Sequence, residues 1–346
     1  MAARAPTRDD VAHRAGASSA VVSYVVNGGP RRVAPATAAR VRAAVAALDY
    51  RPNANARALN TGSTNVLGLV VPDFENAFFA ELAGAVETAA AARGYLVVIA
   101  SSGTDVAAER RLVADLSGRQ VDGLLLITVL APAELRRLPH PGRPTVLMNA
   151  SGPSADFPAV GPAAREGAYA LVEHLVSAHG HRSVALVMGT SAAVVPEPRE
   201  VGWSDALRDH GLPPGPVVRT SFSRHGGYEA TREILRWAKR PSAVFVASDQ
   251  QCVGALRALR EAGLDCPDDL ALVSYDGTEE SRFCWPPLTV ARQPLEAMAE
   301  AALDAVLAPD SPADYRQFGT ELVLRSSCGC PPTRAAGQPQ SSASAR

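Results

Sequence analysis

From Val66 onward, short runs of apolar residues alternate with longer helical patterns. Seven of these runs have the length and the Val, Ile and Leu content of buried strands: VLGLVV, YLVVIA, DGLLLI, PTVLMN, SVALVM, AVFVAS and LALVSY. Helical patterns between them include Phe79 to Arg93, which ends at Gly94, and Ala163 to His179, which ends at Gly180. Strands that alternate with helices predict parallel sheets flanked by helices. At least seven strands are enough for two α/β lobes.

Charge is distributed unevenly along the chain. At 346 residues the chain is long enough for two or three compact units, and its formal net charge is only -1. Residues 1–60, however, hold nine Arg, no Lys and three acidic residues, a net charge of +6, and the remainder carries −7. Only the N-terminal part therefore suits a polyanion such as DNA. A solvated basic face is the alternative interpretation.

The N-terminal segment contains two short helical patterns separated by Gly16. Thr7 and Asp10 have the spacing of a capping box, which predicts a helix from about Arg8 to Ala15. Gly16 permits a tight turn, and Ser18 can cap a second helix. The apolar face of this second helix holds Val22, Val25 and Val26. Its opposite face presents Ser19, Ala20, Ser23 and Tyr24, short or amphipathic side chains that let a helix approach base edges in a major groove.

A third helix is predicted from Pro35 to Leu48, with Val41 and Val45 at helical spacing. On helices alone, the segment could equally be a helical cap on an enzyme. The following stretch, Tyr50 to Gly62, contains a single large apolar residue, Leu59. Two copies of this stretch at a dimer axis could insert their leucines into a minor-groove base step and kink the duplex. An exposed linker leucine is the alternative.

Cysteine and histidine give little indication of a site. The five cysteines, Cys252, Cys266, Cys284, Cys328 and Cys330, form no even disulfide framework, which favours a reducing compartment. The pair Cys328 and Cys330 is spaced too tightly for the usual zinc pair, so we interpret it as structural or incidental. For the cluster His174, His179 and His181 we expect a surface or helix-dipole role rather than a metal site. No export signal and no membrane-spanning run is visible, so we expect a cytoplasmic protein.

Polar residues follow several of the predicted strands, where α/β folds bind ligands, and a cleft between two lobes would add closure. Asp73, Asn76, Phe78 and Phe79 follow the first strand, Asn149 the fourth, and Ser248, Asp249 and Asp276 the later ones, while Arg199 begins a helix. An Asp after a strand is commonly a helix cap, and this is the role we expect for Asp249.

Six segments together carry a family resemblance: DVAHRAGASSAVVSYVVN, LDYRPNANARAL, PREVGW, VASDQQCVGALRAL, VSYDGTEES and PPLTVARQP. They are similar to the lactose-repressor (LacI/GalR) family of bacterial transcription regulators, and the resemblance extends to about Pro331. It implies an N-terminal all-α helix-turn-helix with a hinge helix, followed by an α/β two-lobed periplasmic-binding-protein-like effector domain with parallel sheets. The implied boundaries are 1–50 for the head, 51–65 for the hinge and linker, and 66–331 for the effector domain. Lobe 1 comprises about 66–164 and 293–320, and lobe 2 about 165–292 and 321–331.

The resemblance also assigns the DNA-binding residues. Ser18 to Asn27 becomes the recognition helix and Asn53 to Asn60 a hinge helix that folds on DNA. The expected contacts are Thr7, Ser18, Ser19, Ala20, Ser23, Tyr24, Asn27, Arg31, Arg32, Tyr50, Asn53, Ala56 and Leu59. Tyr24 stands where many members have Arg, so a guanine contact is lost and the half-site preference must differ. The turn from Gly28 to Val33 looks longer than in well-known members, and its two arginines are candidate phosphate contacts.

In the effector domain, the resemblance places Arg199 and Asp276 as the pair that binds ligand hydroxyls or a carboxylate. The full expected effector set is Asp73, Phe78, Phe79, Asn149, Arg199, Ser248 and Asp276, with at least one of the two phenylalanines structural. Trp203 is expected in the core. Asn149, Ser248 and Leu295 depart from well-studied sugar binders, so a sugar or sugar derivative is expected while a purine-type ligand remains open.

These features predict a homodimeric repressor of carbohydrate-related genes that binds a near-palindromic DNA operator and releases it on binding a small molecule. Co-repression is the open alternative. The tail, residues 332–346, should be disordered and lacks the heptads of a tetramer. A solute-binding protein would need an export signal. An α/β enzyme is the other alternative, but the chain lacks G-x-S-x-G and Walker motifs, and we expect no catalytic residues, no cofactor and no metal.

Overall fold

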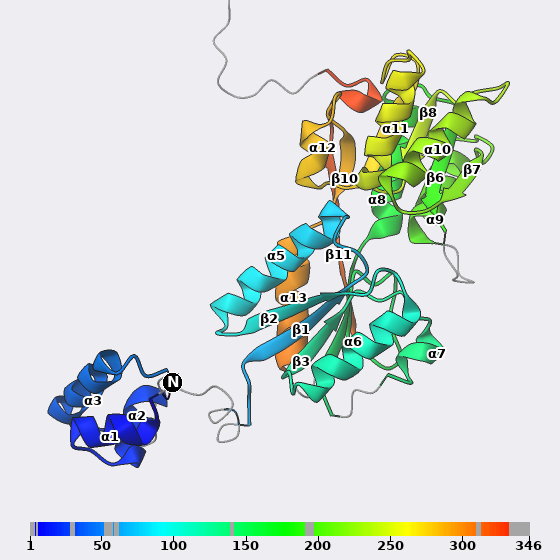
Figure 1. Ribbon diagram of the computed structural model, residues 1–346. Helices are drawn as coiled ribbons and strands as arrows, with labels where there is room; N and C mark the ends of the chain where they lie inside the picture. Colours follow the sequence, from blue (N-terminus) through cyan, green and yellow to red (C-terminus); the bar gives the residue numbers. More distant parts are fainter. Residues whose placement is uncertain are drawn as a thin grey trace, which may run out of the picture. The chain divides into compact units, whose positions relative to one another are not determined.

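The computed structural model describes residues 4, 6–27, 32–51, 58, 62–138, 142–190, 197–308 and 313–331. The chain forms two compact units, Met1–Val66 and Leu67–Arg346, which we call unit 1 and unit 2 (Figure 1). The turn after the second helix, most of the hinge segment and the C-terminal tail lie outside the described residues.

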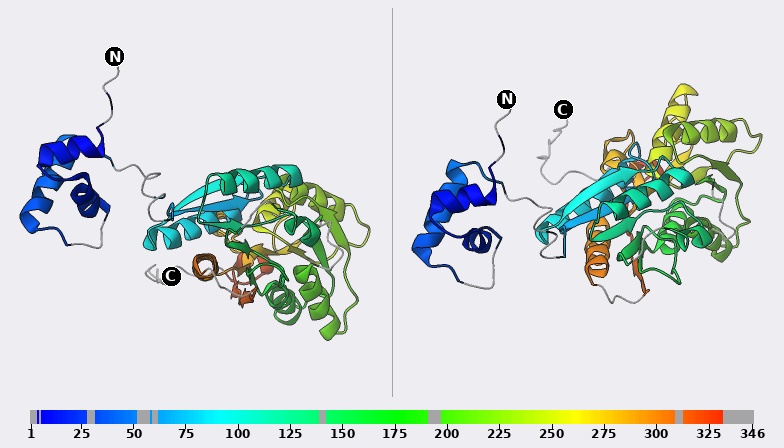
Figure 2. Two further views of the ribbon diagram at one scale, coloured as in Figure 1. Left: turned by 90° about the horizontal axis from the view of Figure 1, so that it is seen from below. Right: turned by 60° about the horizontal axis from the view of Figure 1, so that its bottom comes forward.

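Unit 1 contains three described helices, α1 (Arg8–Ala15), α2 (Ser19–Asn27) and α3 (Pro35–Ala47), visible from two directions in Figure 2. Their bounds agree with the sequence-based prediction to within a residue. Each helix contributes one fully buried valine to the centre, Val11, Val22 and Val41. Gly16 ends α1 in the left-handed conformation at φ 59°, and the Arg40 guanidinium donates from α3 to the Ala15 carbonyl. Three short helices thereby close one small apolar core.

Unit 2 is built from two six-stranded sheets. The first, sheet A, has the strand order β11-β5-β4-β3-β1-β2 and defines lobe 1. Its strands are β1 (Val66–Val71), β2 (Leu96–Ser101), β3 (Gly123–Leu126), β4 (Thr145–Met148), β5 (Ala159–Pro162) and β11 (Tyr315–Phe318). Its helices are α5 (Ala77–Ala92), α6 (Val106–Gly118), α7 (Pro132–Leu135) and α13 (Leu295–Leu307). The core of lobe 1 lies between sheet A and the pair α5 and α13.

The second, sheet B, has the strand order β12-β10-β9-β8-β6-β7 and defines lobe 2. Its strands are β6 (Val184–Gly189), β7 (Val217–Thr220), β8 (Ala243–Val246), β9 (Ala271–Asp276), β10 (Thr289–Arg292) and β12 (Glu321–Val323). Its helices are α8 (Ala164–Ser177), α9 (Pro198–Asp209), α10 (Arg224–Leu235), α11 (Asp249–Glu261), α12 (Glu279–Phe283) and the short 3-10 helix η1 (Ser326–Cys328). Helices α8 and α9 cover one face of sheet B, and α10 and α11 cover the other.

The chain passes between the lobes three times: between β5 and α8, between β10 and α13, and between β11 and β12. Eight strand pairs among the described residues are parallel, and β10 with β12 is antiparallel. The predicted parallel sheets are therefore confirmed. The apolar runs did not reveal strands such as β5, β7 and β11, because β5 ends in Gly-Pro and because β7 and β11 contain Arg219, Arg316 and Gln317. Within the described residues, no helix combines the length and apolar content needed to cross a bilayer.

Candidate DNA interface and effector site

Unit 1 begins with the predicted capping box. The Thr7 backbone N–H donates to Asp10 Oδ2 at 2.7 Å, and the Asp10 N–H donates to Thr7 Oγ1 at 3.4 Å. The hydrogen bonds from Thr7 lower the pKa of Asp10 below its usual value. The carboxylate therefore stays ionised beside the positive end of the α1 dipole and fixes where α1 starts.

Helix α2 carries most of the expected base-reading side chains. Ala20 is exposed and Tyr24 is half-buried. The Ser19 hydroxyl donates to the Asp9 carboxylate, which ties α2 to α1. The Asn27 amide donates to Ser23 Oγ at 3.3 Å, one turn earlier on the same helix. Three of the expected contacts, Ser19, Ser23 and Asn27, thus already have partners within unit 1, and these hydrogen bonds would have to be kept or exchanged on DNA.

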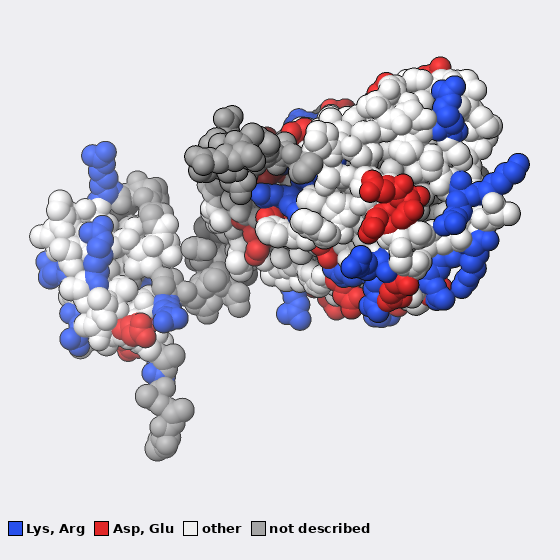
Figure 3. Space-filling view, turned by 90° about the horizontal axis from the view of Figure 1, so that it is seen from above, with Lys and Arg blue, Asp and Glu red and all other residues white. Residues whose placement is uncertain are grey.

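The remaining expected DNA contacts are distributed differently. Ser18 is exposed and caps α2 by accepting from the Val21 N–H at 3.3 Å. Arg32 is exposed, whereas Tyr50 packs against the core of unit 1. Arg31, Asn53, Ala56 and Leu59 lie outside the described residues. Figure 3 shows several basic side chains and few acidic ones on the visible face of unit 1, which fits the charge excess of the segment.

In lobe 2, Arg199 occupies the first turn of α9 and has a side chain only 17% exposed. Its Nε donates to Glu197 Oε1 at 2.8 Å, and its Nη1 donates to the Ala247 carbonyl at 2.7 Å. Glu197 in turn accepts from the Arg199 backbone N–H at 2.9 Å and so caps α9. The guanidinium is therefore held in one position at the carboxyl ends of β6 and β8.

Two aromatic rings flank this guanidinium. Its central carbon lies 5.1 Å from the Phe222 ring centroid and 5.4 Å from that of Tyr275, within the range of cation–π attraction. Burial by itself would lower the pKa of Arg199, but the carboxylates of Glu197 and Asp276 raise it overall. The arginine is thus a permanent cation with unused donors.

Asp276 ends β9 and is only 6% exposed. Its Oδ1 accepts from Gln293 Nε2 at 2.9 Å. Its φ of 116° is unusual for a residue with a side chain, which indicates local strain of the kind that accumulates at functional sites. Burial, reinforced by the nearby carboxyl of Asp249, raises the pKa of Asp276 well above its usual range. The positive charge of Arg199 lowers the pKa of Asp276 and so opposes part of this rise. A ligand that changes the surroundings of one of these two side chains would therefore also affect the other.

Among the described residues, three buried side-chain polar atoms have no hydrogen-bond partner: Gln250 Oε1, Tyr275 Oη and Gln293 Oε1. They lie at the start of α11, at the end of β9 and directly after β10, all at the carboxyl edge of sheet B. A buried polar atom without a partner is costly and rare in native proteins. Two of the three residues contact the charged pair: the Tyr275 ring lies 5.4 Å from the Arg199 guanidinium, and Gln293 donates to Asp276.

Ser248 and Asp249 have structural partners. Ser248 is the N-cap of α11 and accepts from the Gln251 N–H at 3.3 Å. The helix-cap role expected for Asp249 is wrong, because Ser248 caps α11 instead. The Asp249 carboxylate accepts from the Thr278 N–H at 2.7 Å and from the hydroxyls of Thr278 and Ser274. Asp249 therefore holds the loop after β9, and burial raises its pKa to about 6.

The expected lobe 1 residues follow β1 and β4. Asn149 is half-buried at the end of β4 with a left-handed φ of 52°. Asp73 accepts from the Glu75 N–H at 2.8 Å in a tight turn. Phe78 is only 2% exposed and belongs to the lobe 1 core, as expected for at least one of the phenylalanines. Phe79 is half-buried against it, with the ring centroids 5.3 Å apart.

Trp203 is a core residue, as expected. It is 3% exposed, and its indole N–H donates to the Val184 carbonyl at 3.1 Å. Sequence reasoning missed Glu197, Phe222, Tyr275 and Gln293. Gln293 directly follows β10, so the rule that identified Asp276 would have found it if β10 had been recognised as a strand. Phe222 follows β7, an edge strand with one buried residue and a charged one, Arg219, which was not recognised either.

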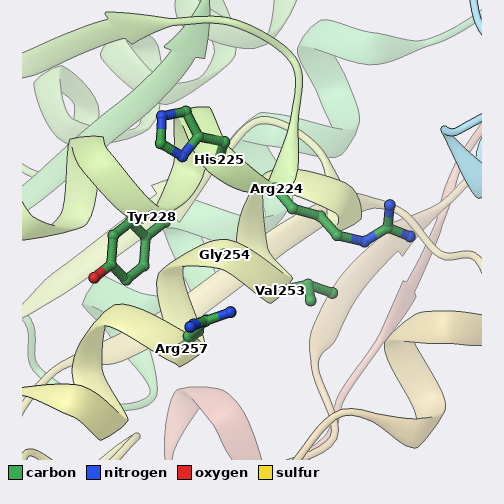
Figure 4. A pocket seen from close by; sticks show the side chains of 6 residues that line it. All are labelled: Arg224, His225, Tyr228, Val253, Gly254 and Arg257. Carbon is green, nitrogen blue, oxygen red and sulfur yellow. The ribbon is translucent and has the colours of Figure 1, made fainter.

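A separate pocket of about 440 Å³ lies between α10 and α11, lined by Arg224, His225, Tyr228, Val253, Gly254 and Arg257 (Figure 4). It includes none of the expected effector residues. Figure 4 shows the Arg224 guanidinium pointing away from Tyr228 and Arg257. It donates instead to the Glu280 carboxylate at 3.0 Å and, across the lobes, to the Glu75 carbonyl at 3.3 Å. The pocket is thus a surface groove beside an interlobe contact.

The fold and these sites define a ligand-sensing protein with two α/β lobes and an N-terminal helix-turn-helix. The family model of bacterial regulatory proteins of the lacI family matches residues 7–53, and that of a periplasmic binding protein-like domain matches residues 172–328. The HTH-type transcriptional repressor PurR of Pectobacterium carotovorum is 35% identical over 306 residues, 87% of this chain and 89% of that protein. The ribose operon repressor of Escherichia coli is 33% identical over 305 residues, 87% and 92% of the two chains.

Solved structures agree with these relatives. The lac repressor dimer bound to operator and the anti-inducer ONPF has a TM-score of 0.84 and 28% identity, covering 94% of this chain and 99% of that one. The chain belongs to the LacI family and is a DNA-binding transcriptional regulator under small-molecule control. Because the family consists of transcription regulators, the enzyme and solute-binding alternatives no longer apply.

Proposed function

We propose that the chain is a homodimeric repressor of carbohydrate-related genes and that its effector binds at the carboxyl edge of sheet B, against Arg199 and Asp276. The observation that carries this proposal is that three buried polar atoms without a partner among the described residues lie at the edge of sheet B that also holds the fixed guanidinium of Arg199. Four further residues are proposed neighbours of the ligand: Asp73, Phe79, Asn149 and Ser248. Ser248 would act through the N-terminus of α11, which it caps.

The chemistry of the unpartnered atoms favours a polyhydroxy ligand. Gln250 and Gln293 each present an amide oxygen, which can only accept, so the ligand must donate to both. Arg199 requires an acceptor, whereas the Tyr275 hydroxyl can donate or accept. A hydroxyl both donates and accepts, so a sugar satisfies all of these groups, and the half-exposed Phe222 offers its pyranose or furanose face an apolar contact. A purine is the second candidate, because a relative at 35% identity is named PurR.

For DNA, we propose that α2 enters the major groove with Ser19, Ala20 and Tyr24 toward the bases. Ser23 would then lie near a phosphate, and we expect the same of Thr7, Ser18, Asn27 and Arg32. Arg31, Asn53, Ala56 and the wedge residue Leu59 stay expectations, since they fall outside the described residues. The lac repressor structure is titled as a dimer bound to operator, which supports a two-fold complex on a near-palindrome. Such a regulator would act in the cytoplasm, with its DNA.

Exposed apolar side chains on both lobes support a dimer. In lobe 1, Leu96 is 64% and Val98 is 40% exposed, both on β2 at the edge of sheet A. In lobe 2, Phe283 is 78% and Trp285 is 91% exposed. Large apolar side chains at this exposure mark interaction surfaces when they gather in patches. We propose that a second copy of the chain covers them.

The decisive experiment is binding of the purified protein to the intergenic DNA beside its own gene, with separate panels of sugars and purines. Specific binding that a sugar reverses is the expected result. Reversal or enhancement by a purine alone would replace the sugar proposal and keep the site. Absence of sequence-selective binding under every condition would overturn the proposed function.

A further inference from the structure

We propose that His174, His179, Cys328 and Cys330 form a structural zinc site in lobe 2. The two histidines end and follow α8, and the two cysteines lie some 150 residues later, in and after η1. Folding brings all four together: their ligand atoms lie within 4.8 Å of one another. We call this set the Cys2His2 cluster. It includes none of the proposed effector or DNA-binding residues.

Four of the six distances between the ligand atoms fit one tetrahedral ion. His174 Nε2 lies 3.2 Å from His179 Nε2. Cys330 Sγ lies 3.4 Å from each of these nitrogens, and Cys328 Sγ lies 3.6 Å from that of His174. Tetrahedral zinc, with bonds of roughly 2.0–2.1 Å to nitrogen and 2.3 Å to sulfur, requires about 3.3 Å between two nitrogens and about 3.6 Å between nitrogen and sulfur. These four edges of the cluster therefore already have the dimensions that zinc imposes.

The backbone between the two cysteines allows both sulfurs to come close to the histidines. Gly329, between them, has a left-handed φ of 103°, and a Cβ there would come 3.1 Å from His179 Nδ1. Any other residue would be strained in backbone and would press on the imidazole. The tight Cys-Gly-Cys spacing, which argued against a zinc pair in the sequence, is thus compatible with two sulfurs that converge on the same point.

A buried network fixes η1 on sheet B. The Thr289 N–H donates to Ser327 Oγ at 2.8 Å, and the Ser327 hydroxyl donates to the Leu272 carbonyl at 2.7 Å. Thr289 Oγ1 lies 3.0 Å from Cys328 Sγ. A hydroxyl beside a ligating sulfur is a typical outer-shell partner of metal sites.

Donor set and position together indicate zinc in a structural role. Two thiolates and two imidazoles in a tetrahedron are typical of zinc. Four protein ligands leave no position for a substrate, as in closed structural sites. Helix α8 leads into the start of β6, so the cluster lies at the amino edge of sheet B, opposite the edge that carries Arg199. Figure 1 shows η1, in red, at the end of lobe 2 away from lobe 1. The ion would join the C-terminal segment to α8.

The test uses the full chain, purified under reducing conditions, with Zn²⁺ and Co²⁺ as probes. We expect one metal per chain by elemental analysis, a tetrahedral thiolate spectrum with Co²⁺, and a melting temperature that falls on chelation. C330S and H174N should lose the metal and the chelator effect. C284S and H181A are matched controls, since Cys284 lies elsewhere and His181 pairs with Ser242 at 2.9 Å. Both should bind like the parent.

Circular dichroism and operator binding establish whether each variant is folded. Metal binding by the unmodified chain is measured directly and does not depend on any variant. If that chain binds neither Zn²⁺ nor Co²⁺ with its thiols reduced, the cluster is a hydrogen-bonded or redox-active thiol pair and the proposal is overturned. Equal metal binding by C330S and C284S would overturn it as well.

Discussion

At position 199, the proposed ligand recognition and the stability of lobe 2 would both depend on one guanidinium. Removing it leaves Glu197, whose side chain is 17% exposed, without its cationic partner. We expect Arg199→Ala to abolish the effector response and to lower the free energy of unfolding by about 3 kcal/mol, as for other buried pairs that lose one member. Operator binding without effector should persist. These effects can be measured by fluorescence anisotropy on labelled operator and by urea unfolding.

A double variant separates the two effects. Arg199→Met with Glu197→Gln removes both charges, while the glutamine oxygen can still cap α9. Stability should return toward that of the parent chain, whereas the effector response should stay lost. If the double variant responded normally to the effector, Arg199 would not belong to the effector site.

Asp249 gives the stability of lobe 2 a predictable pH dependence. Burial raises its pKa from 3.8 to about 6, so the folded state binds the proton more tightly than the unfolded state does. This contribution to stability is complete below pH 4 and disappears as the pH rises through about 6, a change of about 3 kcal/mol. Asp249→Asn should remove it, and the free energy of unfolding should then vary less between pH 4 and 7. A variant with the same pH dependence as the parent would contradict this assignment.

At the level of elements, the capping box decides how firmly α1 is formed. Thr7→Ala removes the oxygen that accepts from the Asp10 N–H, and we expect a loss of about 1 kcal/mol in the stability of unit 1. Operator affinity should fall with it, because α1 supports α2 through the Ser19 to Asp9 hydrogen bond. Thr7→Ser keeps the hydroxyl and is the control. Thermal unfolding of both variants, followed by circular dichroism, measures the difference.

Elements with a local cause were predictable, and those with a distant cause were not. The bounds of α1 follow from Thr7 and Gly16, which act within a few residues of the helix ends. Arg199 at a helix start and Asp276 at a strand end follow from similar local patterns. The Cys2His2 cluster was missed because its two halves meet only after sheet B has formed. The unpartnered Tyr275 hydroxyl is likewise a property of packing, which no local pattern encodes.

For the whole molecule, dimerisation should depend on the exposed apolar side chains. Leu96, 64% exposed on β2, should lie in the proposed interface, so Leu96→Glu should shift the protein toward monomer and weaken operator binding. Glu87→Lys on α5 changes charge without removing apolar surface and serves as a control. Sedimentation at several concentrations measures the association. An unchanged dimer would place the interface elsewhere.

The coupling between ligand and operator should pass through the contacts that join the lobes. Arg224 donates to the Glu75 carbonyl at 3.3 Å, and the Glu279 N–H donates to Glu81 Oε1 at 2.8 Å. Because the chain aligns over 94% of its length with an operator-bound lac repressor dimer, we expect these contacts to favour the operator-binding state. Arg224→Ala should therefore weaken operator binding about threefold and tighten an inducing effector by a similar factor, since linkage is reciprocal. His225→Ala, from the same groove, should change neither. Titrations of effector with and without operator measure both factors, and a loss of both affinities would instead indicate damage to the fold.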